Sequence, residues 1–220
     1  MSDAAANVEG RRASSGRRDQ ILAIASRLFA ERGIRNTTVR DIADAAGMLS
    51  GSLYYHFDSK ESMVDEIMRP FQDLLSVQYE AVMSDGRPAT ERLGDILRLT
   101  FQAIHDHQEA VAIYQNEIAV IGDVPRFAYL RERNEKSRAI WTSILAEGVA
   151  DGELRADLDV DLAFKVLRDS VWSAVRWYSP TGQMSHREIA DQYVYMLLDG
   201  MRANPRAKRS TSAARASAKK

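Results

Sequence analysis

Residues Thr37 to Phe57 read TTVRDIADAAGMLSGSLYYHF, and this stretch decides the fold because it encodes two short helices that meet at a glycine. Thr37 and Thr38 offer side-chain oxygens to cap the first helix, and Asp41 places a carboxylate in its first turn. Gly47 can adopt a positive φ and end that helix. The stretch therefore predicts a helix-turn-helix, with an ordinary αα-hairpin as the alternative.

The second helix of this pair is too short to be stable by itself. We expect Ser50 to be its N-cap, and we expect Leu53 and Phe57, four positions apart, to form its buried face. The remaining side chains then point outward: Tyr54, Tyr55 and His56. An exposed row of two phenols and an imidazole indicates a surface that contacts a partner.

A third helix is needed to cover the apolar faces of this pair. The segment from Asp19 to Gly33 supplies it, with apolar residues at helical spacing and a glycine at its end. The sequence thus predicts a three-helix headpiece. Ser59 then caps a further helix, in which Pro70 predicts a kink or break near Met68 or Arg69.

From Pro88 onward apolar residues recur at helical spacing, and no strand alternation competes with this pattern. A helix capped by Asp159 carries an unbroken apolar stripe from Val160 to Tyr178 and further apolar residues on another side, so we expect it to lie between two other elements. The last helix, Ile189 to Met201, also has a full apolar face. These two helices predict a homodimer built on a four-helix bundle.

The predicted fold class is all-α with about nine helices. It comprises an N-terminal three-helix helix-turn-helix headpiece and a C-terminal helical domain for ligand binding and dimerisation. We place a basic disordered tail over residues 1–16, the helix-turn-helix domain over 17–62, the helical domain over 63–203 and a second basic disordered tail over 204–220.

Charge is distributed unevenly along a chain whose net charge is −1. Residues 17–60 carry seven Lys or Arg against five Asp or Glu, whereas residues 61–200 carry 14 against 24. A basic module on an acidic body would orient a polyanion, such as a nucleic acid, toward the N-terminal end. There is no Cys, and no segment approaches the roughly 20 apolar residues that span a bilayer, so we expect a cytoplasmic protein with no membrane contact.

Catalysis is disfavoured by what the chain lacks. It has four His, no Cys, no Gly-rich phosphate loop and no G-x-S-x-G motif. His105 and His107 are two apart on a predicted helix and point in different directions, so we do not expect them to share a metal. We therefore predict no catalytic residue, no metal site and no cofactor.

Over Ala25 to Lys60 the chain resembles the TetR family of transcriptional regulators. The matching run includes TTVRDIA from Thr37, Ala46-Gly47, and GSLYYHF from Gly51. The remainder resembles the family only in length, helical pattern and the linker from Asp151 to Arg155. The resemblance implies a homodimer that binds a palindromic operator in double-stranded DNA and is released by a small-molecule effector.

The resemblance also implies which residues meet the DNA: Thr38, Arg40, Ser50, Gly51, Ser52, Tyr54, Tyr55, His56 and Lys60. The two serines and the glycine would open the recognition helix and face base edges in the major groove, where such small side chains read few bases directly. The others would contact phosphates, sugars, a thymine methyl or, for Arg40, a base. Arg17 and Arg18 would add a flexible arm. Shape or water-mediated contacts are then expected to carry much of the specificity.

Three residues suggest where an effector binds. Arg168, Trp172 and Arg176 follow at four-residue intervals and so share one side of a helix. In a pocket, a guanidinium would hold a carboxylate, carbonyl or phosphate while the indole covers a ring or acyl face. The alternative is an interface salt bridge to an acid, with Asp161, Asp169 and Asp199 as candidates. Trp141 and Tyr114 are further pocket candidates.

Within the family, this helix resembles repressors of steroid-ring or fatty-acid catabolism, which implies an acyl-CoA thioester as effector. The sequence therefore predicts a ligand-responsive transcriptional repressor. The alternatives are an activator of the same fold and a helical interaction module without specific DNA binding.

Overall fold

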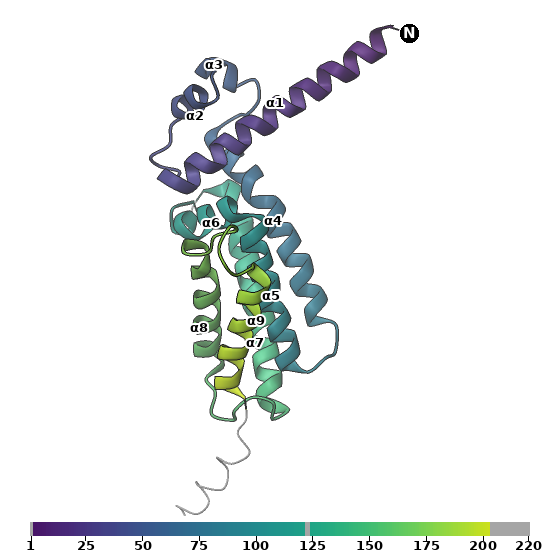
Figure 1. The fold of residues 1–220 in the computed structure, drawn as a ribbon, viewed down its shortest axis with the longest axis vertical. Helices are drawn as coiled ribbons and strands as arrows, with labels where there is room; N and C mark the ends of the chain where they lie inside the picture. Colours follow the sequence, from purple (N-terminus) through teal and green to yellow (C-terminus); the bar gives the residue numbers. More distant parts are fainter. Residues whose placement is uncertain (1, 122–123, 203–220) are drawn as a thin grey trace, which may run out of the picture. The chain divides into compact units, whose positions relative to one another are not determined.

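A computed structural model describes residues 2–121 and 124–202 of the 220-residue chain. Over these residues the protein is all-α, with nine α-helices, two short 3₁₀-helices and no strand beyond one isolated bridge between Leu154 and Arg202 (Figure 1). The chain divides into two compact units, of which the first holds residues 1–74 and 106–133 and the second holds residues 75–105 and 134–220. This division differs from the domain boundary expected after residue 62, because residues 106–133 group with the N-terminal part.

The first unit contains the predicted three-helix headpiece: α1 (Ser2–Arg32), α2 (Val39–Ala45) and α3 (Ser50–Leu53). It also contains the first part of α4 (Lys60–Met83), α6 (Gln108–Ile121) and the 3₁₀-helix η1 (Pro125–Phe127). Helix α1 packs on α2 and on α6, and α2 packs on α3 (Figure 1). The buried apolar residues of the headpiece come from all three helices and the turn after them: Ile21, Ala25, Phe29, Ile42, Ala43, Leu53 and Phe57.

Glycines and capping residues set the limits of these helices. Gly33 has φ +82° and donates its N–H to the carbonyl of Phe29 at 3.0 Å, which ends α1 as predicted. Gly47, with φ +65°, follows α2 in the predicted way. Before α4, the Ser59 hydroxyl accepts from the Ser62 N–H at 3.0 Å, which caps that helix.

The structure differs from the expectation for the N-terminal tail. Residues 2–16 belong to α1 rather than to a disordered tail, because this segment has no proline and is continuous with the packed turns after residue 17. Helix α4 is continuous through Pro70, so the predicted break is absent, and the alternative of a kink near Met68 or Arg69 stays a prediction. The second tail, expected over 204–220, lies outside the described residues.

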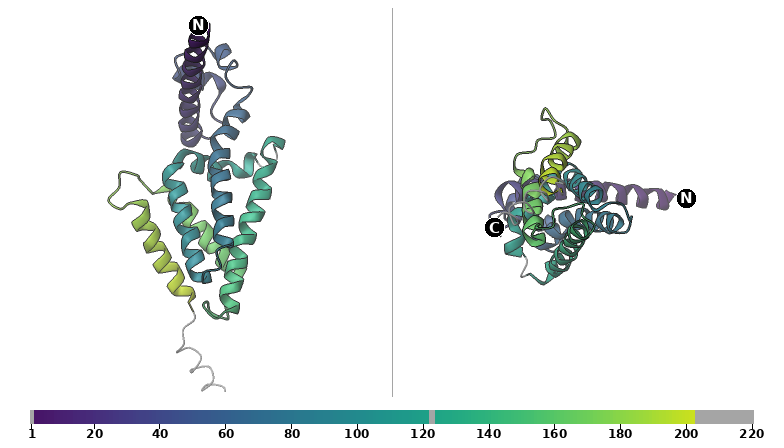
Figure 2. Two further views of the ribbon diagram at one scale, coloured as in Figure 1. Left: turned by 90° about the vertical axis from the view of Figure 1, so that its right-hand side faces the viewer. Right: turned by 90° about the horizontal axis from the view of Figure 1, so that it is seen from below.

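The second unit is a helical bundle, seen from two further directions in Figure 2. It contains the last part of α4, α5 (Ala89–Asp106), most of α7 (Ala128–Ala150), α8 (Val160–Trp172), the 3₁₀-helix η2 (Ser173–Arg176) and α9 (His186–Met201). The buried residues of α5 follow the helical spacing expected after Pro88: Leu93, Ile96, Leu97, Phe101 and Ile104.

Contacts between aromatic rings join the helices of the second unit. The ring of Trp141 on α7 meets Tyr79 of α4 and Phe164 of α8 edge-on, with centroids 6.3 and 6.2 Å apart. Phe101 of α5 meets Tyr193 of α9 at 4.9 Å. These contacts bury the apolar faces that the helical spacing predicts.

The linker after α7 holds the end of this bundle together. The Glu153 carboxylate accepts hydrogen bonds from the N–H groups of Ala89 and Thr90, both at 3.0 Å, and so caps the first turn of α5. Arg155 donates its N–H to the carbonyl of Met201 at 2.9 Å. The linker therefore connects the start of α5 to the end of α9.

Helix α8 is shorter than the sequence predicts. Asp159 is its N-cap, accepting from the N–H of Leu162 at 2.9 Å, which confirms the predicted start. The α-helix ends at Trp172, and the next four residues form η2. The apolar stripe expected along this segment is nevertheless buried as far as Tyr178: Ala163, Phe164, Leu167, Val171, Ala174, Val175 and Tyr178.

Candidate nucleic-acid interface and effector site

The start of α2 is held by a capping box, in which the N-cap side chain and the third helical residue bond to each other's backbone. Thr38 is the N-cap, and its hydroxyl accepts from the N–H of Asp41 at 3.1 Å. The Asp41 carboxylate accepts in return from the N–H of Thr38 at 2.7 Å and from its hydroxyl at 2.5 Å. The hydrogen bonds from the Thr38 hydroxyl and N–H lower the pKa of Asp41.

Thr37 has a different role from its neighbour. Its side chain is fully buried, and its hydroxyl donates to the carbonyls of Gly33 at 2.9 Å and Leu28 at 3.3 Å. Of the two threonines proposed as caps, only Thr38 caps α2. Through these two hydrogen bonds, Thr37 instead stabilises the contact between the α1–α2 turn and the end of α1.

The second helix of the motif, α3, begins one residue before the expected cap. Leu49 is the N-cap and Ser50 is already helical, so the expectation that Ser50 caps the helix was wrong. Leu53 and Phe57 are buried, as predicted, at 1% and 3% exposure. With these two residues buried, Tyr54 and Tyr55 face solvent.

The exposed side of this segment carries the predicted aromatic residues. Tyr54 is 57% exposed and Tyr55 is 91% exposed. Gly51 is exposed as well, whereas the other members are half-buried: Ser50, Ser52 and His56. The segment therefore presents two phenols beside small residues.

Arg40 is the most exposed arginine of the headpiece that has an ion-pair partner. Its side chain is 84% exposed, and its Nε lies 3.7 Å from a carboxylate oxygen of Asp44. This weak pair leaves the guanidinium accessible to a phosphate or a base.

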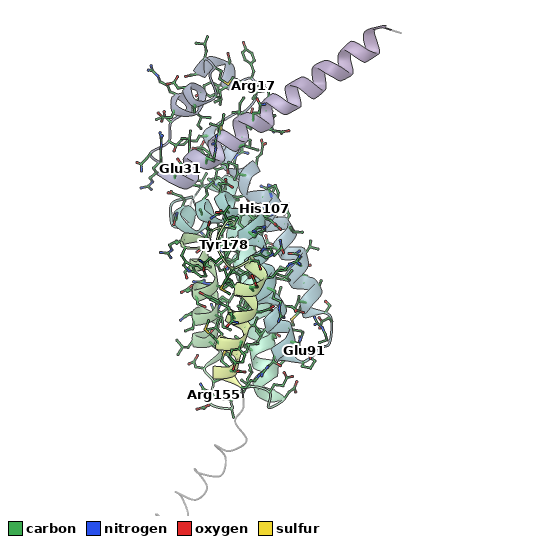
Figure 3. The ribbon with its side chains drawn as sticks, viewed as in Figure 1. Arg17, Glu31, Glu91, His107, Arg155 and Tyr178 are labelled. Carbon is green, nitrogen blue, oxygen red and sulfur yellow. The ribbon has the colours of Figure 1, made fainter. Side chains whose placement is uncertain are left out.

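The other predicted cations turn inward. Arg17, labelled in Figure 3, donates to the carbonyl of Ala46 at 2.7 Å. Arg18 donates to the His56 carbonyl at 3.3 Å and pairs with Glu66 at 2.6 Å. The expectation that these two arginines form a flexible arm was wrong, because α1 carries both of them into the packed headpiece.

Lys60 also finds its partners inside the headpiece. Its ammonium donates to the carbonyls of Ile34 at 2.7 Å and Thr37 at 3.1 Å. In this position it stabilises the α1–α2 turn, which differs from the phosphate contact expected for it.

One exposed residue of this surface was missed by the sequence reasoning. Leu49 is 80% exposed, immediately before α3. An apolar residue between a glycine turn and a serine gives the only sequence signal, and it was overlooked because the serine was taken as the cap.

The predicted effector residues are placed in different surroundings. Trp141 is 1% exposed and packed on all sides, and Tyr114, in the first unit, is buried with its ring edge-on to Phe71. Trp172 is buried at 8% exposure, at the end of α8. The aromatic candidates are therefore mostly core residues.

The two arginines of the predicted pocket are exposed. The Arg168 guanidinium pairs with Asp169 at 2.7 Å and lies 5.5 Å from the centroid of the Phe164 ring. Arg176 belongs to η2, so the four-residue helical spacing stops before it. The predicted alternative of a pair with Asp169 is therefore present, but within one helix.

Two surface clefts of the second unit lie elsewhere. One, of about 350 Å³, is lined by residues of α4 and α5: Gln78, Ala81, Val82, Asp95, Arg98 and Leu99. The other, of about 530 Å³, lies where α4 meets α5 and includes Arg92, Glu147 and Glu153. Neither of these two clefts contains a predicted effector residue.

The described part of the chain shows no group of three or more His, Asp or Glu residues placed to hold a metal. Within the same residues, no helix has the length and apolar character needed to cross a bilayer.

Sequence comparison identifies two family domains. Residues 21–67 match the model described as bacterial regulatory proteins, tetR family, and residues 86–201 match the tetracyclin repressor-like C-terminal domain. The HTH-type transcriptional repressor KstR2 of Rhodococcus jostii (strain RHA1) is 51% identical over 187 residues, which cover 85% of this chain and 92% of that protein.

Two solved structures are similar along most of their length. The ketosteroid transcriptional regulator KstR2 of Mycobacterium tuberculosis is 44% identical with a TM-score of 0.81, covering 86% of this chain and 96% of that one. AibR in complex with isovaleryl coenzyme A and operator DNA is 26% identical with a TM-score of 0.70, covering 83% and 98%.

The headpiece and the helical body thus match the two family domains in chain order, and close relatives match over most of both lengths. The protein belongs to the TetR family of bacterial transcriptional regulators.

Proposed function

We propose that the protein is a homodimeric repressor that binds a palindromic operator through the surface around α3. The observation that carries this proposal is the orientation of the headpiece segment. Leu53 and Phe57 are buried, which leaves Tyr54 and Tyr55 exposed on the other side. Large exposed aromatic side chains on a family DNA-binding domain are suited to contact with DNA backbone and base edges.

Each residue of this surface has a proposed role. Ser50, Gly51 and Ser52 lie at the base edges, and their small size leaves room for water-mediated readout. Tyr54 and Tyr55 contact phosphates, sugars or a thymine methyl, and His56 contacts a phosphate. Thr38 and Arg40 hold the backbone beside α2. Lys60, whose ammonium is bonded to the carbonyls of Ile34 and Thr37, acts by holding the α1–α2 turn in place.

The proposed dimer interface is formed by the outer faces of α8, η2 and α9. Large apolar side chains on α8, directly after η2 and on α9 are exposed in the single chain: Leu162, Val166, Trp177, Tyr195 and Met196. Exposed apolar surface on two neighbouring helices fits the four-helix bundle of a two-fold dimer. Such a dimer would place its headpieces about one DNA turn apart, roughly 34–36 Å.

We propose an acyl-CoA thioester from steroid or other lipid catabolism as the effector. Two comparisons support this class: one relative is a ketosteroid regulator, and another was solved with isovaleryl coenzyme A. In this chain Arg168 and Arg176 are exposed cations that could hold phosphate or carbonyl oxygens, and Trp172 lies on the same helix as Arg168. All three residues belong to the second unit.

Release requires that the ligand bind the two conformations of the protein with different affinity. Because α4 contributes residues to both units, we propose that ligand in the body shifts α4 and thereby the separation of the two recognition segments. The coupling in such systems is typically about 1–3 kcal/mol.

The experiment combines a DNA measurement with a ligand measurement. Retention on operator DNA should weaken steeply with salt, because phosphate contacts release counterions. A long-chain or ring-bearing CoA thioester should release the DNA, whereas free CoA and the free acid should not. Salt-independent retention would favour the interaction module without specific DNA binding. Loss of target-gene transcription on deletion of the protein would identify an activator.

A further inference from the structure

Leu49 is the second most exposed large hydrophobic residue of the described chain, after Tyr55. It is 80% exposed and precedes α3 in an extended conformation, with φ −72° and ψ 140°. Its carbonyl accepts from the N–H of Ser52 at 2.9 Å, so its backbone is ordered by the helix that follows. The side chain therefore has a fixed starting point and projects into solvent.

Two local preferences oppose a leucine at this position. N-caps favour Ser, Thr, Asp or Asn, whose side-chain oxygen accepts a backbone N–H, and leucine is among the poorest choices. Here no side chain caps α3. An exposed leucine also leaves apolar surface in water without a packing partner. Leu49 goes against both preferences, and no contact within the described chain compensates for this. We therefore infer that its side chain contacts a partner outside the chain.

We propose that Leu49 is a specificity-determining residue that packs on the C5-methyl group of a thymine in the operator. The inference rests on the proposed DNA-binding function and names one contact of that surface. Leucine has no hydrogen-bonding atom, and the thymine methyl is the apolar group on base edges in the major groove. Its neighbours Ser50 and Gly51 are small, so they leave the leucine side chain free to reach a base.

Uracil substitution tests this contact because deoxyuridine pairs like thymidine and lacks only the methyl group. Duplexes selected by the wild-type protein from random DNA are remade with each thymidine replaced singly by deoxyuridine, and their affinities are measured by fluorescence anisotropy. For the wild type, at least one thymine per half-site should be sensitive, with a loss of about fourfold, the equivalent of about 0.8 kcal/mol for one buried methyl.

Variants of Leu49 test whether this residue causes the sensitivity to the thymine methyl group. Leu49→Ala and Leu49→Ser should bind the deoxyuridine and thymidine duplexes equally at that position, whereas Leu49→Met should keep the preference. Leu49→Ser restores a capping hydroxyl, so it should unfold at no lower temperature than the wild type. This variant separates loss of readout from loss of fold. Val77→Ala, at an exposed apolar residue of α4 outside the proposed DNA surface, is the matched control, and it should keep the methyl preference at the leucine position.

The outcomes separate two failures. If the wild type prefers selected over scrambled DNA but no deoxyuridine duplex binds more weakly, the Leu49 contact is overturned and the DNA-binding function stands. The same holds if Leu49→Ala and Leu49→Ser keep the full methyl preference, or if they change only the oligomeric state. If the wild type shows no preference for any DNA sequence, the proposed function fails and the contact fails with it.

Discussion

The guanidinium of Arg18 lies 4.5 Å from the centroid of the Phe57 ring, and so joins α1 to the last residue of the helix-turn-helix stretch. The same side chain donates to the His56 carbonyl at 3.3 Å and pairs with Glu66 of α4 at 2.6 Å. Arg18 therefore connects three parts of the first unit: α1, the end of the helix-turn-helix stretch and α4. The exposed Tyr54 and Tyr55 lie three and two residues before Phe57, so their position depends on this contact.

Replacing Arg18 should destabilise the headpiece without touching the DNA-facing side chains. Arg18→Ala removes a cation–π contact and a partly exposed ion pair, so we expect a loss of about 1–2 kcal/mol in the free energy of unfolding. Arg18→Lys should not restore it, because an ammonium lacks the planar donors that reach both partners. Urea unfolding measures both variants.

Arg40→Ala is the control for that experiment. Its side chain is 84% exposed and weakly paired, so the unfolding free energy should change by less than about 0.5 kcal/mol while DNA affinity falls. Equal loss of stability in the Arg18 and Arg40 variants would contradict the bridging role of Arg18.

A side chain at Gly33 should destabilise the end of α1. Gly33→Ala forces a Cβ into φ +82° and places it 2.7 Å from Oε1 of Glu117, whereas Gly47→Ala, at φ +65°, meets nothing within 4 Å. We expect about 1–2 kcal/mol of destabilisation for the backbone strain at either position, and more at Gly33 because Glu117 must move. In thermal unfolding, adding Glu117→Ala should return Gly33→Ala to the level of Gly47→Ala. No relief by Glu117→Ala would show that the carboxylate does not restrict this turn.

The capping box of α2 should make part of the free energy of unfolding depend on pH. Hydrogen bonds from Thr38 lower the pKa of Asp41 in the folded state. A carboxyl whose folded pKa is lowered contributes stability above its ordinary pKa, about 4, and that contribution is lost as the pH falls through the folded pKa. The free energy of unfolding of Asp41→Asn should therefore fall less steeply than that of the wild type as the pH is lowered from about 4 to 2.

Thr38→Ser keeps the hydroxyl donor and is the matched control for the acid experiment. It should retain the acid dependence of the wild type in circular dichroism melts taken across this pH range. An Asp41→Asn curve parallel to the wild-type curve would rule out this carboxylate as a source of the acid sensitivity.

The proposed dimer can be broken from the exposed face of α8. Leu162 and Val166 are 60% and 52% exposed, so a glutamate at either position should hardly change the stability of the single chain. In the dimer it would bury a charge, and Val166→Glu should therefore sediment as a monomer at micromolar concentration. DNA affinity should fall by about a hundredfold or more, because two linked headpieces bind more tightly than one. Val77→Glu, on α4 and 66% exposed, should remain dimeric, and a dimeric Val166→Glu would refute this interface.

Effector release should depend on the exposed cation of α8. Arg168→Ala should bind operator DNA normally and require about 10 to 100 times more CoA thioester for release, the range expected for a lost charge-assisted hydrogen bond. Trp172 is buried, so Trp172→Phe is preferable to an alanine variant that would leave a cavity. Lys165→Ala, exposed on the same helix, is the control. Normal release from both Arg168→Ala and Trp172→Phe would reject the pocket assignment.

The all-α fold and the headpiece could be predicted because their determinants are local. Helical periodicity shows which faces of the helices are buried, and the positive φ angles of Gly33 and Gly47 fall at the predicted helix ends. The cap at Thr38 was predictable for the same reason, since its partner Asp41 is three residues away.

The positions of the long cationic side chains depend on tertiary packing and could not be predicted. Arg17, Arg18 and Lys60 were taken as free cations, yet their acceptors are carbonyls that lie 23 to 38 residues away along the chain. The end of α8 is similar: no proline or glycine lies between Val160 and Ser173, so nothing local marks the change to 3₁₀ geometry. Leu49 was missed because two adjacent residues could each begin α3 and the polar one was chosen.

Selection of bound duplexes from random DNA by the full-length protein tests the central claim, that the surface around α3 reads an operator as part of a dimer. We predict enrichment of a palindrome whose half-sites are centred about 10 base pairs, or a multiple of one helical turn, apart. Replacing both Tyr54 and Tyr55 with Ala should abolish the enrichment while the protein remains folded and dimeric. Failure of the wild-type protein to enrich any sequence, or equal enrichment by the double variant, would contradict the account.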